Sequence, residues 1–571
     1  MTVGAPAGMP AAMSVPATPA WRLADEVDAF RAATEMELAL WVGRLEHIEH
    51  WDDISEGGHA DRFARLATYG ERASALGDDP SLSSADRSLV EAIAFMVGAE
   101  QATSRWRPEL MWVNPAVGLL PTLVAMLPRY GLLSAADGDG YLAKISAMPA
   151  FVDQWCDRLR RAAAVGRLPI GRLIDGSIAQ IDDLLAAPLG GGPFGGQAPP
   201  RDLDEATGVL WRTELRRRLD GEVTAALGRL RDVLGEIRPV APADDTPGLC
   251  HLAGGAELYE RLVAANTSIE ISASEVHQIG HEQVARVEHD FREMAGPLLG
   301  TTDIGEIFER LRTDPALHYG DSAELVADAT ETLARATAAA PAWFGRLPSA
   351  GCTASAIDAG ALAYYSPPAR NGSRPGAFFF NTSDPTAWGR FDLQSTTFHE
   401  GIPGHHLQLA LAQEIDGLHP LLADEYVVAY CEGWGLYAER LADEMGLYST
   451  PLDRVGMLAG AAMRACRLVV DTGLHALGWS REQAIAYMVE HSPMSRHQVE
   501  AEVDRYIGDP GQALGYMIGR LEIDRIRADA EQRLGARFDI RAFHDTVLTV
   551  GSVPLTTLAR VVDEWVNGVP A

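Results

Sequence analysis

The sequence predicts a mainly α-helical protein with a small β-hairpin, and three observations support this fold class. Apolar residues recur at three- and four-residue spacing along most of the 571-residue chain. Segments rich in glycine and proline interrupt this pattern and mark loops. One segment has aromatic runs on both sides of an Asn-Gly pair, which is typical of a hairpin turn. The chain is too long for one ordinary core, so we expect more than one sub-domain.

The first 254 residues are predicted to hold a tail, a helical region and a linker. Residues 1–20 are rich in Ala, Pro and Met and lack the features of a signal peptide, so we expect a disordered tail. Residues 21–187 are expected to form an N-terminal helical region, with helical patterns at 22–50, 84–101, 138–165 and 173–187. Residues 188–254 are expected to be a linker plus a helix, because PLGGGPFGGQAPP at 188–200 precedes a helical pattern at 203–237.

Residues 255–571 are predicted to be helical and to carry the functional site. Ser272 and Glu275 have the spacing of a capping box at the start of a helix. Around the Asn-Gly pair we expect a hairpin of residues 361–365 and 376–381, and after it two long helices at 391–413 and 420–445.

Composition excludes several classes of partner. The formal net charge is −31 and the isoelectric point is about 4.9, so we expect no nucleic-acid partner and no binding to an anionic membrane surface. No segment is long and apolar enough for a membrane span. The five cysteines have no CxxC spacing, which favours a reducing compartment and a cytoplasmic location. The oligomeric state remains open.

The segment His399-Glu400-Gly401-Ile402-Pro403-Gly404-His405-His406 predicts a metal site. In H-E-x-x-H, two histidines four residues apart bind one zinc ion and the glutamate acts as general base. Here the fourth position after His399 is Pro403, and on an ideal helix His405 would point about 120° away. A break at Pro403-Gly404 would bring His405 back towards His399. We favour His405 as the second ligand, with His406 as the competing one.

The third metal ligand is expected to be an acid on the next helix. Glu432 follows His405 by 27 residues and lies among Cys431, Gly433 and Trp434, which suggests burial. A buried acid needs a partner, and a metal ion is one. Glu439 is seven residues further on and would hydrogen-bond a ligand histidine or pair with Arg440. Glu425 lies seven residues before Glu432, on the same face of the predicted helix. For Glu425 we favour a place on a solvated acidic face.

A purely structural interpretation competes with the metal site. Thr397 and Glu400 have capping-box spacing, so Glu400 would then only cap a helix. Three histidines within eight residues beside a glutamate and a Pro-Gly distortion favour the functional interpretation.

Four blocks in order resemble the bacterial domain-of-unknown-function 885 family, which is commonly described as metallopeptidase-like. These blocks are FHEGIPGHHLQ, EGWGLYAERL, RYIGDPGQALGYMIG and FHDTVLTVGSVPL, at 398–408, 432–441, 505–519 and 543–555. The resemblance covers roughly residue 255 to the C-terminus. It implies a large multi-helix gluzincin-like fold with a long central cleft, similar to oligopeptidases and thermostable carboxypeptidases. It also implies that His399, His405 and Glu432 hold the metal, with Glu400 as base.

The expected chemistry is hydrolysis of an amide bond with one zinc ion as cofactor and a peptide or small amide as substrate. Candidate donors to the oxyanion are Tyr516, Tyr506 and His497. Arg505 or Arg520 would bind a substrate carboxylate. The strand that contains Phe379 would pair with an extended substrate backbone.

Other functions remain open at this point. The first alternative is a metal-dependent amidohydrolase of a small metabolite. The second is a non-catalytic binding protein that retains the fold, although Glu400 argues against it. A structural helical scaffold would bind no metal in stoichiometric amount.

Overall fold

Helices build almost the whole molecule, as the sequence predicted. The computed structural model describes residues 18–36, 43–104, 113–358, 360–370, 372 and 374–570, and it is 70% helix and 3% strand. The expected tail falls outside the described residues up to position 17, and Asn371 and Ser373 of the expected turn are also outside them. No helix in the described ranges is long and apolar enough to cross a bilayer.

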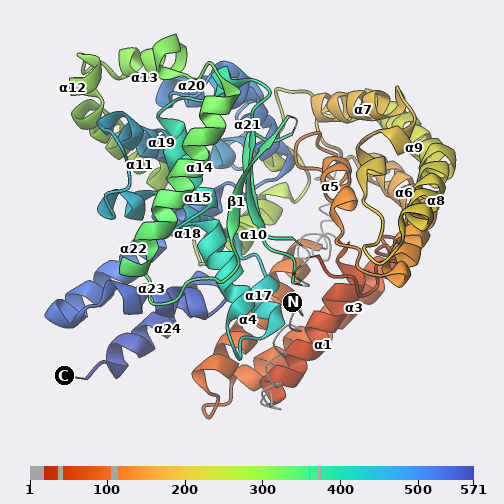
Figure 1. The fold of residues 1–571 in the computed structure, drawn as a ribbon, viewed down its shortest axis with the longest axis horizontal. Coiled ribbons are helices and arrows are strands. Elements are labelled where there is room, and N and C mark those ends of the chain that lie inside the picture. The colour runs from red at the N-terminus through yellow and green to blue at the C-terminus, as the bar shows by residue number, and fades with distance from the viewer. Residues whose placement is uncertain are drawn as a thin grey trace, which may run out of the picture.

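Helices from the two ends of the chain share one core. At the N-terminal end these are α1 (Pro19–Thr34), α3 (Glu56–Gly77) and α4 (Ser84–Ser104). At the C-terminal end they are α22 (Leu514–Leu534), α23 (Ile540–Thr549) and α24 (Leu555–Gly568). Their buried apolar side chains form one cluster with those of α18 (Val428–Glu444), and α1, α3 and α4 lie at the lower edge of the view in Figure 1.

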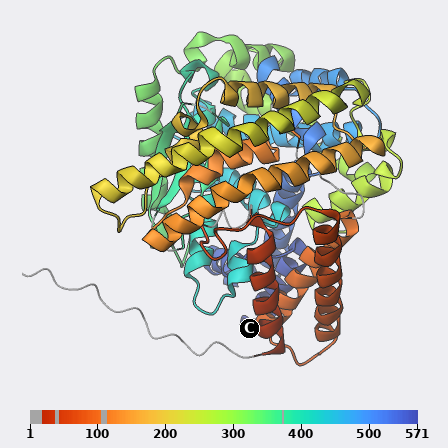
Figure 2. The same cartoon turned by 90° about the vertical axis from the view of Figure 1, so that its right-hand side faces the viewer.

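A second core lies in the segment that follows α4. It is formed by α5 (Leu119–Met126), α6 (Ala135–Ala164), α7 (Gly171–Leu185), α8 (Glu205–Arg218) and α9 (Thr224–Ile237). Figure 2 shows the long helices of this group as one layer that faces the viewer. The segment 188–200, which was expected to be a linker, connects α7 to α8, and its Leu189 and Phe194 are buried in this core at 2% and 1% exposure. The Gly-Pro-rich segment is therefore a packed connection.

The remaining helices form the part of the chain that holds the site. They are α10 (Gly255–Thr267), α11 (Ala273–Met294), α12 (Gly296–Leu299), α13 (Ile304–Thr313), α14 (Ser322–Ala339), α19 (Pro451–His475), α20 (Arg481–His491) and α21 (Arg496–Gly508). The capping box predicted for Ser272 and Glu275 opens α11, where each side chain bonds the backbone N–H of the other residue. Helices α11 and α19 pack against each other along much of their length.

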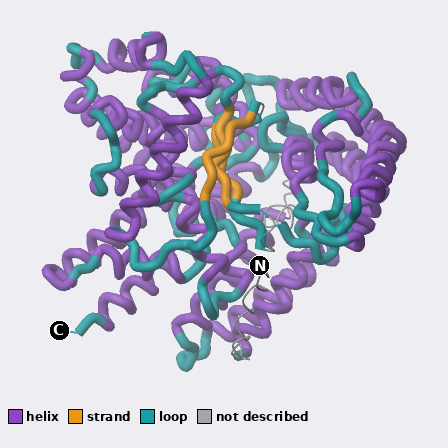
Figure 3. Tube along the Cα trace, in the orientation of Figure 1, coloured by secondary structure: helices purple, strands orange, loops and turns teal. Residues whose placement is uncertain are grey.

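A three-stranded sheet stands among these helices (Figure 3). Its strands β1 (Cys352–Ile357), β2 (Ala363–Ser366) and β3 (Gly376–Asn381) are in the order β1-β3-β2. The predicted hairpin is confirmed, because β2 and β3 are antiparallel. Strand β1 pairs with β3 in parallel and was not predicted. Its short Cys-Thr-Ala-Ser-Ala-Ile run lacks the aromatic residues that identified the hairpin.

Both helices predicted after the hairpin are interrupted. The first ends as α15 (Asp392–Glu400) and continues after a break as the π-helix η11 (His406–Ala410) and α16 (Leu411–Glu414). The second is divided into α17 (Pro420–Asp424) and α18. These interruptions position the candidate site.

Candidate metal centre

The break after α15 returns the chain towards its own last turn. The backbone leaves the helix at Gly401, and the next helical residue is His405. A Cβ atom on Gly404 would lie 1.9 Å from the carbonyl oxygen of His399, so only glycine fits at this approach. The two histidines flank the break, and their ring centroids are 4.7 Å apart. His405 lies six positions after His399 in the sequence. Because of the break, its side chain reaches the place that a residue four positions after His399 would occupy on an ideal helix.

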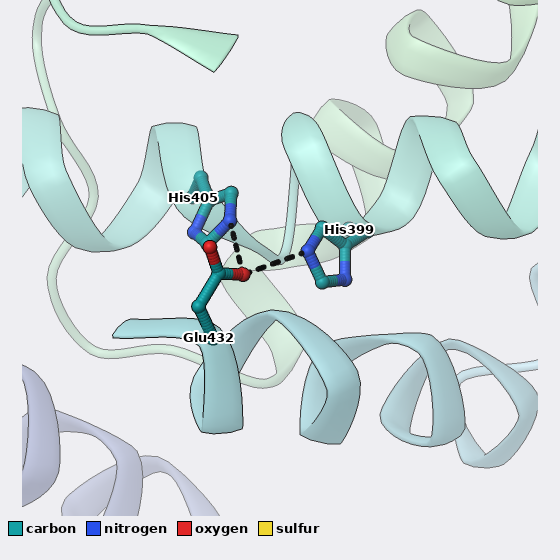
Figure 4. Close-up of side chains that lie close together, drawn as sticks. All are labelled: His399, His405 and Glu432. Atoms are coloured by element: carbon teal, nitrogen blue, oxygen red, sulfur yellow. Dashed lines mark ion pairs between the residues drawn. The ribbon is translucent and has the colours of Figure 1, made fainter. Parts of the chain in front are cut away.

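Helix α18 brings the acid against these two histidines. A Cβ atom on Gly435 would lie 2.6 Å from Cε1 of His399, so the absence of a side chain there lets the helix approach the ring. Glu432 lies one turn earlier on the same helix and points to both imidazoles (Figure 4). In the pattern Glu-x-x-Gly on α18, Glu432 therefore supplies a carboxylate, and Gly435 leaves space for the ring of His399.

The three side chains converge with the spacing of ligands around one metal ion. Oε2 of Glu432 lies 3.4 Å from Nε2 of His399 and 3.4 Å from Nε2 of His405 (Figure 4). All three residues are buried, and their ligand atoms lie within 4.8 Å of one another. Ligands about 2.1 Å from a tetrahedral zinc ion lie about 3.4 Å apart. Among the described residues, this is the one group of His, Cys, Asp or Glu side chains with such spacing.

The hydrogen bond between His399 and Glu439 favours a cation between His399 and Glu432. Nδ1 of His399 donates a 2.8 Å hydrogen bond to Oε1 of Glu439, so in the neutral imidazole Nε2 has its lone pair towards Glu432. A lone pair and a carboxylate oxygen repel each other unless a proton or a metal ion lies between them. Oε2 of Glu432 and Nδ1 of His405 are buried and have no hydrogen-bond partner among the residues that the structure describes. A metal ion would satisfy Glu432 and both Nε2 atoms together, so the residues present fit zinc.

Without metal, protonated histidine takes the role of the cation. Burial alone would lower the pKa of His399, but the nearby Glu432 carboxylate and the hydrogen bond to Glu439 outweigh it and raise the pKa to about 9. Burial opposes ionisation of Glu432 as well, yet the contacts with His399 and His405 hold its pKa well below the ordinary value. In the metal-free site the His399 imidazole therefore carries a proton, which a metal ion would displace on binding.

Glu400 lies beside this group without a partner. It is half-buried, and no hydrogen bond or ion pair engages its carboxylate in the described part of the chain. Burial raises the pKa of Glu400 above its ordinary value, although the nearby His399 and His405 act in the opposite direction. The capping-box interpretation is wrong, because Thr397 lies inside α15 and its hydroxyl bonds the carbonyl oxygen of Leu393. An uncommitted carboxylate of raised pKa is typical of a general base.

A set of supporting residues surrounds the three side chains. Glu439 also accepts a bond from Ser395 and pairs with Arg464 at 3.4 Å, which fixes its carboxylate. Tyr426 donates a 2.8 Å hydrogen bond to Oε1 of Glu432 and so leaves Oε2 facing the histidines. Sequence reasoning missed Ser395, Arg464 and Tyr426, because no short spacing relates them to the residues that they hold. Glu425 is not on a solvated face, since it forms an ion pair with Arg31.

Tyr516 is the oxyanion-donor candidate that lies at the site. Its ring is nearly parallel to that of His399, at 15° and 6.4 Å between centroids. The guanidinium carbon of Arg467 lies 4.4 Å from the centre of the Tyr516 ring. Burial raises the pKa of Tyr516 to about 12, and the negative charge of Glu432 adds to this. The hydroxyl therefore keeps its proton at neutral pH and can donate it in a hydrogen bond.

The other two donor candidates lie elsewhere. The Tyr506 hydroxyl is fully buried, donates to Glu502 and accepts from Nε of Arg467, so it is committed to a packing network. His497 is exposed near the start of α21 and makes no contact with the three converging side chains. Both residues fail the geometric requirement for an oxyanion donor.

The remaining expectations also need correction. His406 accepts a hydrogen bond from Tyr365 and donates one to the carbonyl oxygen of Ala350, so it holds the sheet rather than a metal ligand. Arg505 is engaged by Glu502 and Gln512, and Arg520 by Asp524. Arg520 also lines a cavity of about 70 Å³ beside Glu439, between α11, α18, α19 and α22. Phe379 lies on the central strand, whose edges are both paired, so that strand cannot add a substrate backbone.

Comparisons with known proteins extend over nearly the whole chain. Residues 37–562 match a family model described as "Bacterial protein of unknown function (DUF885)", and no curated protein matches. A solved structure of a "putative lipoprotein" from Colwellia psychrerythraea is similar with a TM-score of 0.89 and 25% identity, over 97% of this chain and 100% of that one. A second "putative lipoprotein of unknown function", from Shewanella oneidensis, has a TM-score of 0.69 and 18% identity, over 95% of this chain and 99% of that one. The family match spans far more than half of the sequence, and the chain belongs to the DUF885 family of bacterial proteins.

Proposed function

We propose that this protein is a zinc-dependent hydrolase that cleaves amide bonds, and that it acts as a peptidase of the oligopeptidase or carboxypeptidase type. One observation carries the proposal. Two histidines and a glutamate converge at the ligand spacing of a single zinc ion, beside a half-buried glutamate that has no partner. A structural zinc site is closed by four protein ligands, whereas three ligands and a free carboxylate are typical of hydrolytic sites.

Each residue has a role that follows from its contacts. His399, His405 and Glu432 would hold zinc, which when bound polarises a carbonyl group and makes a water molecule more acidic. Glu400 would take the proton of the attacking water and pass it to the leaving amine. Glu439 orients His399, and Tyr426 orients Glu432. The Tyr516 hydroxyl would donate a hydrogen bond to the oxyanion.

The sheet offers a place for an extended peptide. Strand β1 is an edge strand, since its one neighbour within the described residues is β3. Its first residue, Cys352, lies near Glu400: burial raises the pKa of the Cys352 thiol, and the charge of Glu400 adds to this. A substrate backbone would add to the free edge of β1 by main-chain hydrogen bonds. A gluzincin-like arrangement with a long cleft belongs to this proposal. So does a cytoplasmic location, which agrees with five unpaired cysteines.

The test combines metal analysis with turnover. We expect about one zinc ion per purified chain and loss of that ion in His399→Ala and Glu432→Ala. The wild type should cleave members of a peptide library, followed by mass spectrometry, and Glu400→Gln should keep the metal and lose about a hundred- to ten-thousandfold in rate. Glu444→Gln is the matched control, because Glu444 ends α18 and pairs with Arg527. Absence of metal, or full turnover by Glu400→Gln, would refute the proposal.

A further inference from the structure

The face of the sheet that is turned away from α14 and α15 carries two aromatic side chains that are only partly buried. Phe378 and Phe380 point to the other face, where they pack with α14 and α15. On the face turned away from these helices, Tyr364 and Phe379 are paired across β2 and β3, and their rings stack at 5.0 Å. Both side chains are half-buried. We call this pair the aromatic platform.

Two arginines from distant parts of the chain meet at the aromatic platform. Arg129 comes from the second core and donates a 2.6 Å hydrogen bond to the Tyr364 hydroxyl. Its guanidinium carbon lies 4.9 Å from the centre of the Phe379 ring. Arg374 lies just before β3 and donates to the hydroxyl of Ser366, on the same face as Tyr364. Both arginines are half-buried.

Neither arginine has an acidic partner among the described residues, although the chain carries 79 acids and 48 bases. Nη1 of Arg129 is buried and has no hydrogen-bond partner in the described part of the chain. Burial lowers the pKa of Arg374, and the positive charge of Arg129 lowers it further, so the two guanidinium groups repel each other. Arg370 is the contrasting case, because it pairs with Asp424, which Arg44 also contacts.

We propose that Arg129 and Arg374 form a binding site for an oxyanion, either a carboxylate or a phosphate, on the aromatic platform. An oxyanion between the two guanidinium groups removes their repulsion and satisfies the free donors of both. The hydroxyls of Tyr364 and Ser366 accept from the arginines, so their own protons are free to donate to the same ligand. Water molecules could accept hydrogen bonds from the free donors of Arg129 and Arg374, but they would not neutralise the two positive charges. An anion does both and is therefore the ligand that fits this site.

This site is separate from the candidate metal centre. Tyr364 and Ser366 face away from Tyr365, which bonds His406 on the opposite side of the sheet. The inference therefore stands on its own observations and does not depend on hydrolytic activity. An aromatic pair flanked by two cations suits an anionic group carried on an apolar or planar body.

The test is calorimetric titration of the full-length protein with two probes, succinate and inorganic phosphate, at constant ionic strength. We expect saturable binding of at least one probe by the wild type, and about tenfold or greater weakening in Arg129→Gln and in Arg374→Gln. Arg370→Gln is the matched control and should bind like the wild type. Glu432→Gln should also bind like the wild type, which separates this site from the metal centre. Preference for succinate or phosphate assigns the chemistry of the anion.

A measurement of thermal stability distinguishes a variant that has lost the binding site from one that has failed to fold. In buffer without either probe, Arg374→Gln should be at least as stable to heat as the wild type, because it removes a repulsive charge. Arg370→Gln should be less stable, since it breaks an ion pair. The site is refuted if neither probe binds saturably, or if Arg129→Gln and Arg374→Gln bind as well as Arg370→Gln.

Discussion

Nδ1 of His399 and Oε1 of Glu439 are joined by a 2.8 Å hydrogen bond between two buried side chains. The bond fixes both the ring orientation of His399 and the nitrogen that keeps its lone pair. The same carboxylate is held by Ser395 and Arg464, so its position is determined from three sides. The metal affinity of the site should depend on a residue that touches no metal.

The first prediction concerns this carboxylate. Glu439→Gln should weaken zinc binding about 10- to 100-fold, because the amide is a poorer acceptor and lowers the basicity of His399. Affinity is measured by competition with a chromophoric chelator. Glu444→Gln changes an exposed acid of the same helix and should leave affinity unchanged. Equal affinity of Glu439→Gln and the wild type would contradict the role assigned to Glu439.

The second prediction separates two tyrosines that the sequence could not distinguish. Tyr516→Phe should lower kcat about 100-fold or more with little change in KM, because its hydroxyl would act only on the transition state. Tyr506→Phe should mainly lower the thermal midpoint, since it removes a buried hydrogen bond to Glu502. Steady-state kinetics on a peptide cleaved by the wild type and thermal unfolding give the two measurements. Similar kcat values for Tyr516→Phe and the wild type would exclude Tyr516 as the donor.

The third prediction tests the close approach of α18 to the ligand histidine. A methyl group at position 435 would lie 2.6 Å from Cε1 of His399, so Gly435→Ala should displace the ring and weaken zinc binding about tenfold or more. Gly228→Ala is the control, because a Cβ there meets nothing within 4 Å. Circular dichroism checks that helix content is kept. Unchanged zinc affinity in Gly435→Ala would show that zinc binding does not require the His399 ring to lie against position 435.

The sequence predicted the local pattern of the site better than its surroundings. His399, His405 and Glu432 could be selected because a helical break and a buried acid have recognisable signals in Pro403-Gly404 and in the residues around Glu432. The helix at 391–413 was predicted with a break at Pro403-Gly404, and the structure ends its first part at Glu400. The break was inferred from the backbone properties of Pro403-Gly404 together with the six-residue spacing of the two histidines.

The failures share one physical cause, which is contact between segments far apart in the sequence. Tyr506, Tyr516 and Arg505 lie within a dozen residues, and only packing against α19 decides which of them reaches the site. The glycine and proline content of 188–200 predicted a linker, but it did not reveal that Leu189 and Phe194 pack into a core made by other helices. Amino-acid composition indicates the conformational freedom of the local backbone, but it does not show which distant segments a side chain packs against.

The last prediction concerns competition between zinc and a proton at His399. In the metal-free protein the pKa of His399 is raised to about 9, so at pH 7 its imidazole is protonated and zinc must displace that proton. Apparent zinc affinity should therefore rise by about tenfold per pH unit as pH increases from 7 towards 9, and level off above the pKa. Addition of zinc to weakly buffered metal-free protein at pH 7 should release about one proton, detected with an indicator dye. In Glu439→Gln the pKa of His399 loses one of the bonds that raise it, so the affinity should level off at a lower pH. An affinity that does not change between pH 7 and pH 9 would show that the imidazole between Glu432 and Glu439 is already neutral, and that the charge of the free site is balanced in another way.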